Sequence, residues 1–216
     1  MPASEPVRTR IEPASTGRAK CRGCGRKIDK GELRFGEVLP NPFGEGDATY
    51  YFHLACAACM RPEGFLPALE RAALPDGAMA AALRSLAELG IQHRRLTRLA
   101  RAERAASGRA RCRLCHDLIE KNTLRFALQL FEDGRMAPIG TIHVQCAEAY
   151  FGTAELLERL ERLGAVLPED RPELVTLLAN QRPAPEGGSA PGLAKAGVEA
   201  EAESESLKRD AGGNTR

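Results

Sequence analysis

Residues 107–115, with the sequence SGRARCRLC, repeat residues 16–24, TGRAKCRGC, at an offset of 91 positions. The match continues at the same offset, from IDKGELRF at residues 28–35 to IEKNTLRF at residues 119–126. The chain therefore contains an internal duplication, and each copy carries a Cys-x-x-Cys pair near its beginning.

Each copy closes with a His-x-x-Cys pair, HLAC at residues 53–56 and HVQC at residues 143–146. The offset is now 90, because the second copy has lost one loop residue. The two pairs are separated by 28 residues in the first copy and by 27 in the second. Three thiolates and one imidazole form the ligand set of a closed, structural zinc site. The sequence thus predicts two structural zinc ions, one held by Cys21, Cys24, His53 and Cys56 and the other by Cys112, Cys115, His143 and Cys146.

Length and composition agree with two small modules in one chain of 216 residues. A unit of roughly 60 to 75 residues gains little stability from its core alone, so a metal ion is a sensible addition. Seven cysteines, six of them in the paired spacings, favour metal binding in a reducing compartment over a disulfide framework. The sequence has no signal-peptide pattern and no apolar run of 18 residues. We therefore expect an intracellular protein without a membrane partner, in the cytoplasm or nucleoid if bacterial and in the nucleus if eukaryotic.

Composition and turn signals divide the chain into five segments. Residues 1–14 and 181–216 are rich in Pro, Gly, Ser, Ala and charge, which predicts a disordered lead-in and a disordered C-terminal tail. Between them lie the first zinc module at residues 15–75, a helical connector at 76–106, and the second module with trailing helices at 107–180. Between its ligand pairs each module should form a short antiparallel sheet, because so long a stretch without structure would be unusual. The predicted fold class is small α+β modules, each a sheet plus helix, stabilised by zinc.

The connector predicts a helix with Asp76 as its N-cap and a possible break at Gly90. Its apolar residues alternate spacings of three and four, which places them on one face. This face can pack on the neighbouring modules, or it can pair residues 79–100 with a second subunit or another protein. Cys59, which has no counterpart in the second copy, is expected to be a buried or free thiol. On this apolar face, His93 is expected to be packed and not to be a metal ligand. The residues of the face are Met79, Ala82, Leu86, Leu89, His93, Leu96 and Ala100.

Positive charge is concentrated although the formal net charge is only +2. Residues 91–115 hold eight arginines against the single acid Glu103, and residues 17–35 hold seven Lys or Arg against two acids. A charge run is ordinarily a solvated face, so charge alone identifies no partner.

The ordered motifs resemble the poly(ADP-ribose) polymerase-type zinc finger. They are Gly-Arg-Ala-(Lys/Arg)-Cys-x-x-Cys, Ile-(Asp/Glu)-Lys, Leu-Arg-Phe, and an aromatic residue ahead of His-x-x-Cys, over residues 15–70 and 107–160. Fingers of this family recognise DNA nicks and ends, so the resemblance implies two such fingers, DNA binding and a role in DNA damage and repair. Guanidinium groups beside a rigid zinc knuckle can grip phosphates at little entropic cost. The matched positions, with the basic residues of the same motifs, give as DNA contacts Arg18, Lys20, Arg34, Arg109, Arg111 and Arg125.

Family fingers also present apolar loop residues that stack on bases exposed at a break. These side chains can equally close the small core, and spacing alone leaves both roles open. The second copy departs from the family where the aromatic pair Tyr51-Phe52 becomes Thr141-Ile142. The candidates for stacking are Leu39, Phe43, Leu130, Phe131 and Met136.

Three functional hypotheses follow. The first is a non-enzymatic protein that recognises nicks, gaps and ends by shape, in which Arg34→Ala and Arg125→Ala each weaken binding and flatten its salt dependence. No room is left for a polymerase catalytic domain, and no NAD-binding, ligase, nuclease or deaminase motif is present. The second is a zinc-stabilised assembly module that binds proteins and no nucleic acid. The third, a thiol redox or zinc-release sensor, is disfavoured because closed sites bury their sulfurs.

Overall fold

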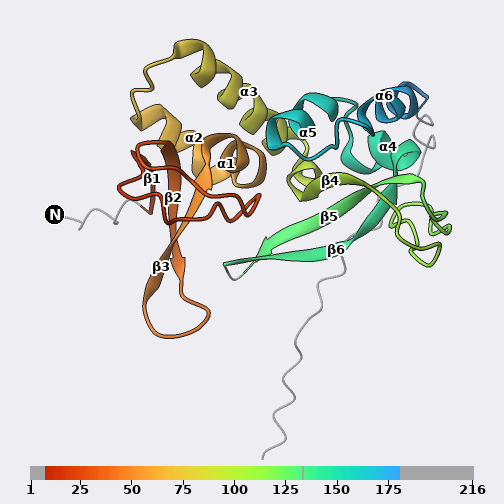
Figure 1. The fold of residues 1–216 in the computed structure, drawn as a ribbon. Coiled ribbons are helices and arrows are strands. Elements are labelled where there is room, and N and C mark those ends of the chain that lie inside the picture. Colours follow the sequence, from red (N-terminus) through yellow and green to blue (C-terminus); the bar gives the residue numbers. More distant parts are fainter. Residues whose placement is uncertain (1–7, 133, 181–216) are drawn as a thin grey trace, which may run out of the picture. The chain divides into compact units, whose positions relative to one another are not determined.

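Two halves of the chain repeat one fold in the computed structural model (Figure 1). The structure describes residues 8–132 and 134–180, so the disordered tail predicted for residues 181–216 lies outside the described residues. Each half contains a three-stranded antiparallel sheet, in the order β1-β2-β3 and β4-β5-β6. Helices follow each sheet along the chain. The predicted class of small α+β modules is confirmed.

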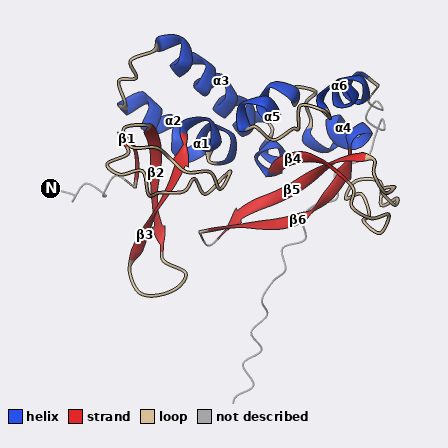
Figure 2. Ribbon diagram, viewed as in Figure 1, coloured by secondary structure: helices blue, strands red, loops and turns tan. Residues whose placement is uncertain are grey.

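The first half is a sheet with helices on one face (Figure 2). Phe35 of the second strand lies opposite Phe52 of the third, and both rings are fully buried. Phe65 from a helix packs edge-on against Phe35, with ring centroids 5.7 Å apart. This aromatic group joins sheet and helix into one core. The elements are β1 (Thr9–Pro13), β2 (Leu33–Pro40), β3 (Asp47–His53), α1 (Leu54–Met60), α2 (Pro62–Arg71) and α3 (Gly77–Gln92).

The second half follows the same plan with shorter helices. Leu124, Phe126 and Leu128 are buried at alternate positions of one strand, which confirms the predicted half-buried strand. Phe126 meets Phe151 of a helix at a centroid distance of 6.4 Å. The elements are η1 (Arg94–Arg98), β4 (Leu99–Arg104), β5 (Leu124–Glu132), β6 (Arg135–His143), η2 (Val144–Cys146), α4 (Ala147–Phe151), α5 (Leu157–Leu163) and α6 (Arg171–Ala179).

The first strand of each sheet lies where no strand was predicted. The expectation of a disordered lead-in over residues 1–14 is wrong for Thr9–Pro13, which pair with β2. The connector predicted as helical over residues 76–106 ends its helix at Gln92, and Leu99–Arg104 pair with β5. Both strands are short edge strands with charged side chains, so neither carries the long alternating pattern that identifies a strand in sequence.

Helix α3 packs on its own module. Its predicted N-cap is confirmed, since the Asp76 carboxylate accepts hydrogen bonds from the amides of residues 78 and 79. Gly90 does not break the helix; it is buried beside Pro62. Leu83 and Leu86 lie in the core of the first module, against α1 and α2. The face of α3 that carries these two residues is therefore already covered. Within the described part of the chain, no helix has the length and hydropathy to cross a membrane.

Candidate metal centres and nucleic-acid interface

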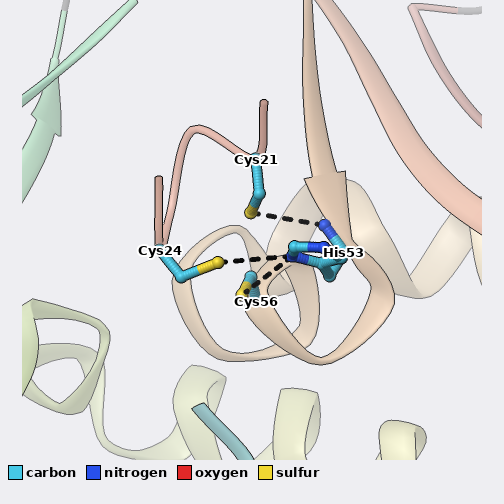
Figure 3. Close-up of side chains that lie close together, drawn as sticks. All are labelled: Cys21, Cys24, His53 and Cys56. Carbon is cyan, nitrogen blue, oxygen red and sulfur yellow. Dashed lines mark hydrogen bonds between the residues drawn. The ribbon is translucent and has the colours of Figure 1, made fainter. Parts of the chain in front are cut away.

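The first metal centre forms where a knuckle, a strand end and a helix start meet (Figure 3). Cys21 and Cys24 come from the knuckle, His53 is the last residue of β3, and Cys56 lies in the first turn of α1. Their four ligand atoms all lie within 4.8 Å of one another. Nδ1 of His53 is 3.3 Å from Sγ of Cys24 and 3.9 Å from Sγ of Cys56. Nε2 of the same ring lies 3.1 Å from the Lys27 carbonyl oxygen, which orients the ring toward the thiols.

The ligand atoms of the second centre have nearly the same arrangement and distances. Nδ1 of His143 is 3.4 Å from Sγ of Cys115 and 3.9 Å from Sγ of Cys146, while Nε2 lies 3.2 Å from the Leu118 carbonyl oxygen. The backbone amide of His143 donates to Sγ of Cys112 at 3.5 Å. The structure therefore brings together all eight residues predicted as ligands, in two groups of four.

Ionisation of the thiols is strongly coupled within each centre. Hydrogen bonding by Cys21, and then by Cys56, lowers the pKa of Cys24 far below its ordinary value. Hydrogen bonding by Cys21 and Cys24, together with burial, raises the pKa of Cys56. In the second centre burial opposes ionisation of Cys112, but donation by the surrounding amides outweighs it and lowers the pKa to about 7. Each centre thus contains one thiol with a lowered pKa, and in the second centre burial raises the pKa of both other thiols, Cys115 and Cys146.

This donor set fits a zinc ion. Three sulfurs and one imidazole nitrogen at mutual distances below 4.8 Å can converge on one tetrahedral cation with bonds of about 2.0 to 2.3 Å. A divalent cation would replace the shared protons and favour all three thiolates. All four positions are filled by side chains, so the role of the metal is structural. The two centres are Cys₃His zinc-binding sites.

The knuckles require left-handed backbone at the residue after the second cysteine. Gly25 has φ 73° in the first copy, and His116 has φ 64° at the matching position in the second. Glycine adopts this conformation freely, whereas a side chain makes it unfavourable. His116 is exposed and does not join the ligand group, in agreement with the assignment of His143.

The surroundings of the two centres differ in charge. Arg26 donates from Nε to Sγ of Cys24 at 3.5 Å, so a cation supports the first thiolate cluster. The matching residue in the second copy is Asp117, which offers no such donor when ionised. A cavity of about 300 Å³ opens beside the second centre, and its lining includes Asp117, Gln145 and the ligand His143. Three ligands of the second centre line this cavity, and its Cys146 is 8% exposed whereas Cys56 of the first centre is 1% exposed, so the second centre is the more accessible one.

Arg34, predicted as a DNA contact, is held inside a row of side chains across the first sheet. Glu12 pairs in register with Arg34, and Arg34 pairs with the ligand His53. Only 6% of Arg34 is exposed. Its Nη2 donates to Glu12 at 2.8 Å, and its guanidinium carbon lies 3.6 Å from the centroid of the Tyr51 ring. While this arrangement persists, burial and the ion pair with Glu12 keep the guanidinium from contacting a phosphate.

The second sheet contains the same row. Glu103 pairs in register with Arg125, which pairs with the ligand His143. Nε and Nη2 of Arg125 both donate to Glu103, at 3.1 and 2.7 Å. We name the two sets, Glu12–Arg34–His53 and Glu103–Arg125–His143, the Glu–Arg–His rows. Sequence analysis missed both acids, although an Arg-x-Glu triplet recurs at residues 10–12 and 101–103 with the offset of the duplication.

The other four predicted DNA contacts lie at the surface. Arg18 and Lys20 precede the first knuckle, Arg109 and Arg111 precede the second, and all four are exposed. Arg111 also donates to the carbonyl of His116 at 3.0 Å. Each pair thus lies within a few residues of the first two ligands of its centre.

The apolar candidates behave differently in the two copies. Phe43, in the loop between β2 and β3, is 71% exposed, while Leu39 is half-buried against the first core. Phe131 is only 9% exposed and lies in the core of the first module, where Met136 packs beside it. Cys59 is fully buried, and burial raises the pKa of its thiol.

Fold and donor set define a Cys₃His zinc finger made of a sheet and a following helix, present twice. Residues 12–67 match the family described as the poly(ADP-ribose) polymerase and DNA-ligase zinc-finger region. The chain is also similar to poly(ADP-ribose) polymerase 1 of Gallus gallus, with 29% identity over 136 residues, which are 56% of this chain and 13% of that protein. The chain thus spans a small part of that relative's length. The resemblance predicted from the motifs is confirmed, and the second centre supports a second finger.

Proposed function

We propose that this chain binds DNA at nicks, gaps and ends, and that it does so without catalysing a reaction. The observation that carries the proposal is the placement of exposed cations beside both zinc knuckles, at positions repeated by the duplication. A zinc-held knuckle fixes the backbone of its neighbours, so little entropy is lost when a guanidinium binds a phosphate. The match of residues 12–67 to a family named for a polymerase and a DNA ligase agrees with a nucleic-acid ligand.

Phosphate contacts are assigned first to the four exposed cations, Arg18, Lys20, Arg109 and Arg111. Arg34 and Arg125, which the sequence motifs gave as DNA contacts, are assigned a different role. Their ion pairs join β1 to β2 and β4 to β5, and each arginine lies in register with the ligand histidine of the next strand. We therefore assign them to support of the zinc centres, because a phosphate would have to displace Glu12 or Glu103 to reach them. Their direct contact with DNA is retained only as a proposal that requires those pairs to open.

Preference for a break is assigned to the exposed ring of Phe43. An aromatic ring on a loop can stack on a base whose neighbour is missing, which a continuous duplex does not offer. Readout would follow the shape of the break and not the sequence.

Fluorescence anisotropy with nicked, blunt-ended and closed hairpin duplexes, at two or more salt concentrations, tests this function. Arg18→Ala and Arg109→Ala should each weaken binding and reduce the slope of log K against log salt by about 0.9. The matched control is Arg84→Ala, an exposed arginine of α3 that pairs with Glu70. Zinc-stripped protein should not bind.

The outcomes separate the parts of the proposal. Equal affinity for nicked and closed duplexes would reject the break preference and retain general DNA binding. Absence of binding to any of the three duplexes by zinc-loaded protein would reject the function. Salt-insensitive oligomers in that case would favour an assembly module, with pairing through residues 79–100.

A further inference from the structure

Side chains of the second finger lie inside the core of the first. Phe131 of β5 meets Phe52 and Tyr50 edge to face, with ring centroids 5.3 and 5.8 Å apart and interplanar angles near 75°. Phe52 is fully buried and directly precedes the ligand His53. An aromatic ring buried in this way contributes both area and geometry-specific attraction. The contact therefore reaches the residue next to the first zinc centre.

The guanidinium of Arg61, in the first finger, also contacts the Phe131 ring. The guanidinium carbon of Arg61 lies 5.1 Å from the centroid of the Phe131 ring. The same guanidinium binds Glu37 through two hydrogen bonds of 2.7 and 2.8 Å. Gly134, in the turn after β5, lies so close to Tyr50 that a Cβ there would overlap the ring. The tip of the β5–β6 hairpin is thus shaped to the first finger.

A second contact joins helix α5 to the knuckle of the first finger. Nη2 of Arg26 donates to the carbonyl of Leu163 at 3.3 Å, while Nε of the same group donates to Sγ of the ligand Cys24. Leu163 is itself buried in the first core. The fully buried Arg159 donates to the carbonyl of Cys59, which lies on α1, the helix that supplies the ligand Cys56. Two ligand-bearing elements of the first centre therefore contact α5.

The same hairpin leads to the second zinc centre. Phe131 lies on β5, whose partner strand β6 ends at the ligand His143. If the second centre loses its metal, the end of β6 loses its anchor, and the hairpin that fills the first core is released. Small modules near the lower limit of stability depend on such additional burial.

We infer that the two fingers fold as one cooperative unit in which each zinc site strengthens the other through Phe131 and α5. The coupling is reciprocal, as any linkage between two binding sites must be. It does not depend on DNA binding, so it stands or fails separately from the proposed function.

The first test removes one ligand of the more accessible centre in the full chain, with Cys146→Ser. Zinc content and chelator competition with a chromogenic zinc indicator then report the remaining site. Coupling predicts that the first centre binds zinc at least tenfold more weakly than in the unmodified chain. Retention of one zinc ion with unchanged affinity overturns the inference.

The second test leaves all eight ligands in place and truncates the contact, with Phe131→Ala. The unmodified chain should unfold in one transition and release both ions in one kinetic phase. Phe131→Ala should split the unfolding into two transitions and accelerate release from the first centre, and loss of both ions on purification would support coupling equally. The matched control is Leu167→Ala, which truncates a side chain that is 54% exposed and lies outside this contact, and which should keep a single transition. Identical unfolding and zinc release in the two variants overturns the inference.

Discussion

Replacing Glu12 by Gln removes one negative charge from the first Glu–Arg–His row and leaves its shape. The side chain of Arg34 is 7% exposed, and its Nη2 to Glu12 distance is 2.8 Å. Among the described residues, Glu12 is the one anion that this guanidinium binds. Nε of Arg34 is buried and has no hydrogen-bond partner among those residues. Because arginine stays protonated at any pH at which the protein folds, the substitution leaves a nearly buried cation without a counterion.

The expected loss in the free energy of unfolding follows from how deeply the Glu12–Arg34 ion pair is buried. Removing one partner of a fully buried ion pair costs about 3–5 kcal/mol. The Glu12 side chain is 31% exposed, so water screens part of the interaction, and the Gln amide oxygen can still accept a hydrogen bond. We therefore expect Glu12→Gln to lower the free energy of unfolding by about 1–2 kcal/mol. The equivalent Glu103→Gln should have a similar effect in the second finger.

The sign of the pH dependence is fixed by the pKa of Glu12. Burial raises this pKa, but hydrogen bonds from Arg10 and Arg34 outweigh burial and leave it lowered. A lowered folded-state pKa gives stability that is complete above the unfolded value and is lost as pH falls through the folded value. The difference between Glu12→Gln and the unmodified chain should hence be constant from pH 6 to 8 and shrink only in acid.

Urea unfolding of zinc-loaded protein, followed by circular dichroism at pH 6, 7 and 8, measures this difference. Glu70→Gln is the matched control, since its partner Arg84 and its own side chain are exposed, and a change below about 0.5 kcal/mol is expected. A Glu12→Gln variant as stable as that control would refute the reasoning. A variant that loses stability progressively between pH 6 and 8 would show that another group titrates.

Two further predictions concern the knuckles. Chelation of both ions should unfold both fingers, because structural zinc contributes about 10–16 kcal/mol in small finger peptides; a cooperative thermal transition that persists in metal-free protein would contradict this. Gly25→Ala should destabilise the first finger by about 1 kcal/mol through its positive φ alone, since no atom lies within 4 Å of the added methyl group. His116→Ala, with a side chain already at the matching position, should change the melting temperature little, and equal shifts for the two variants would reject the backbone explanation.

The metal ligands could be predicted because they leave a pattern that does not depend on packing. Cys-x-x-Cys and His-x-x-Cys recur with nearly equal spacing, and chemistry allows few other uses for them. The hairpin strands and the helix beginning after Asp76 were also accessible from alternation and capping. β1 and β4 were not, because a short edge strand with charged side chains has the composition of a loop. Only comparison of the Arg-x-Glu triplets across the duplication would have found them.

The burial of individual arginine side chains could not be predicted from the sequence in the same way. Arg34 has the composition of a surface residue, and its burial depends on Glu12, a residue 22 positions away that belongs to an unrecognised strand. Arg159 is fully buried beside a carbonyl 100 positions away. Such placements arise from tertiary contacts, which a local pattern does not contain.

The duplication gave two hairpins with different lengths, and this difference divides their roles. In the first finger, six residues separate β2 from β3, and the loop presents the exposed ring of Phe43. In the second finger, β5 and β6 run almost to the turn at Gly134, so no loop remains to present a side chain, and Phe131 is buried in the neighbouring core. A sequence repeat alone assigns the same task to both tips. A tip whose aromatic ring is already buried cannot also stack that ring on a base. Under the proposed function, aromatic stacking at a break is therefore assigned to Phe43 of the first finger, and the second finger is assigned the phosphate contacts of Arg109 and Arg111.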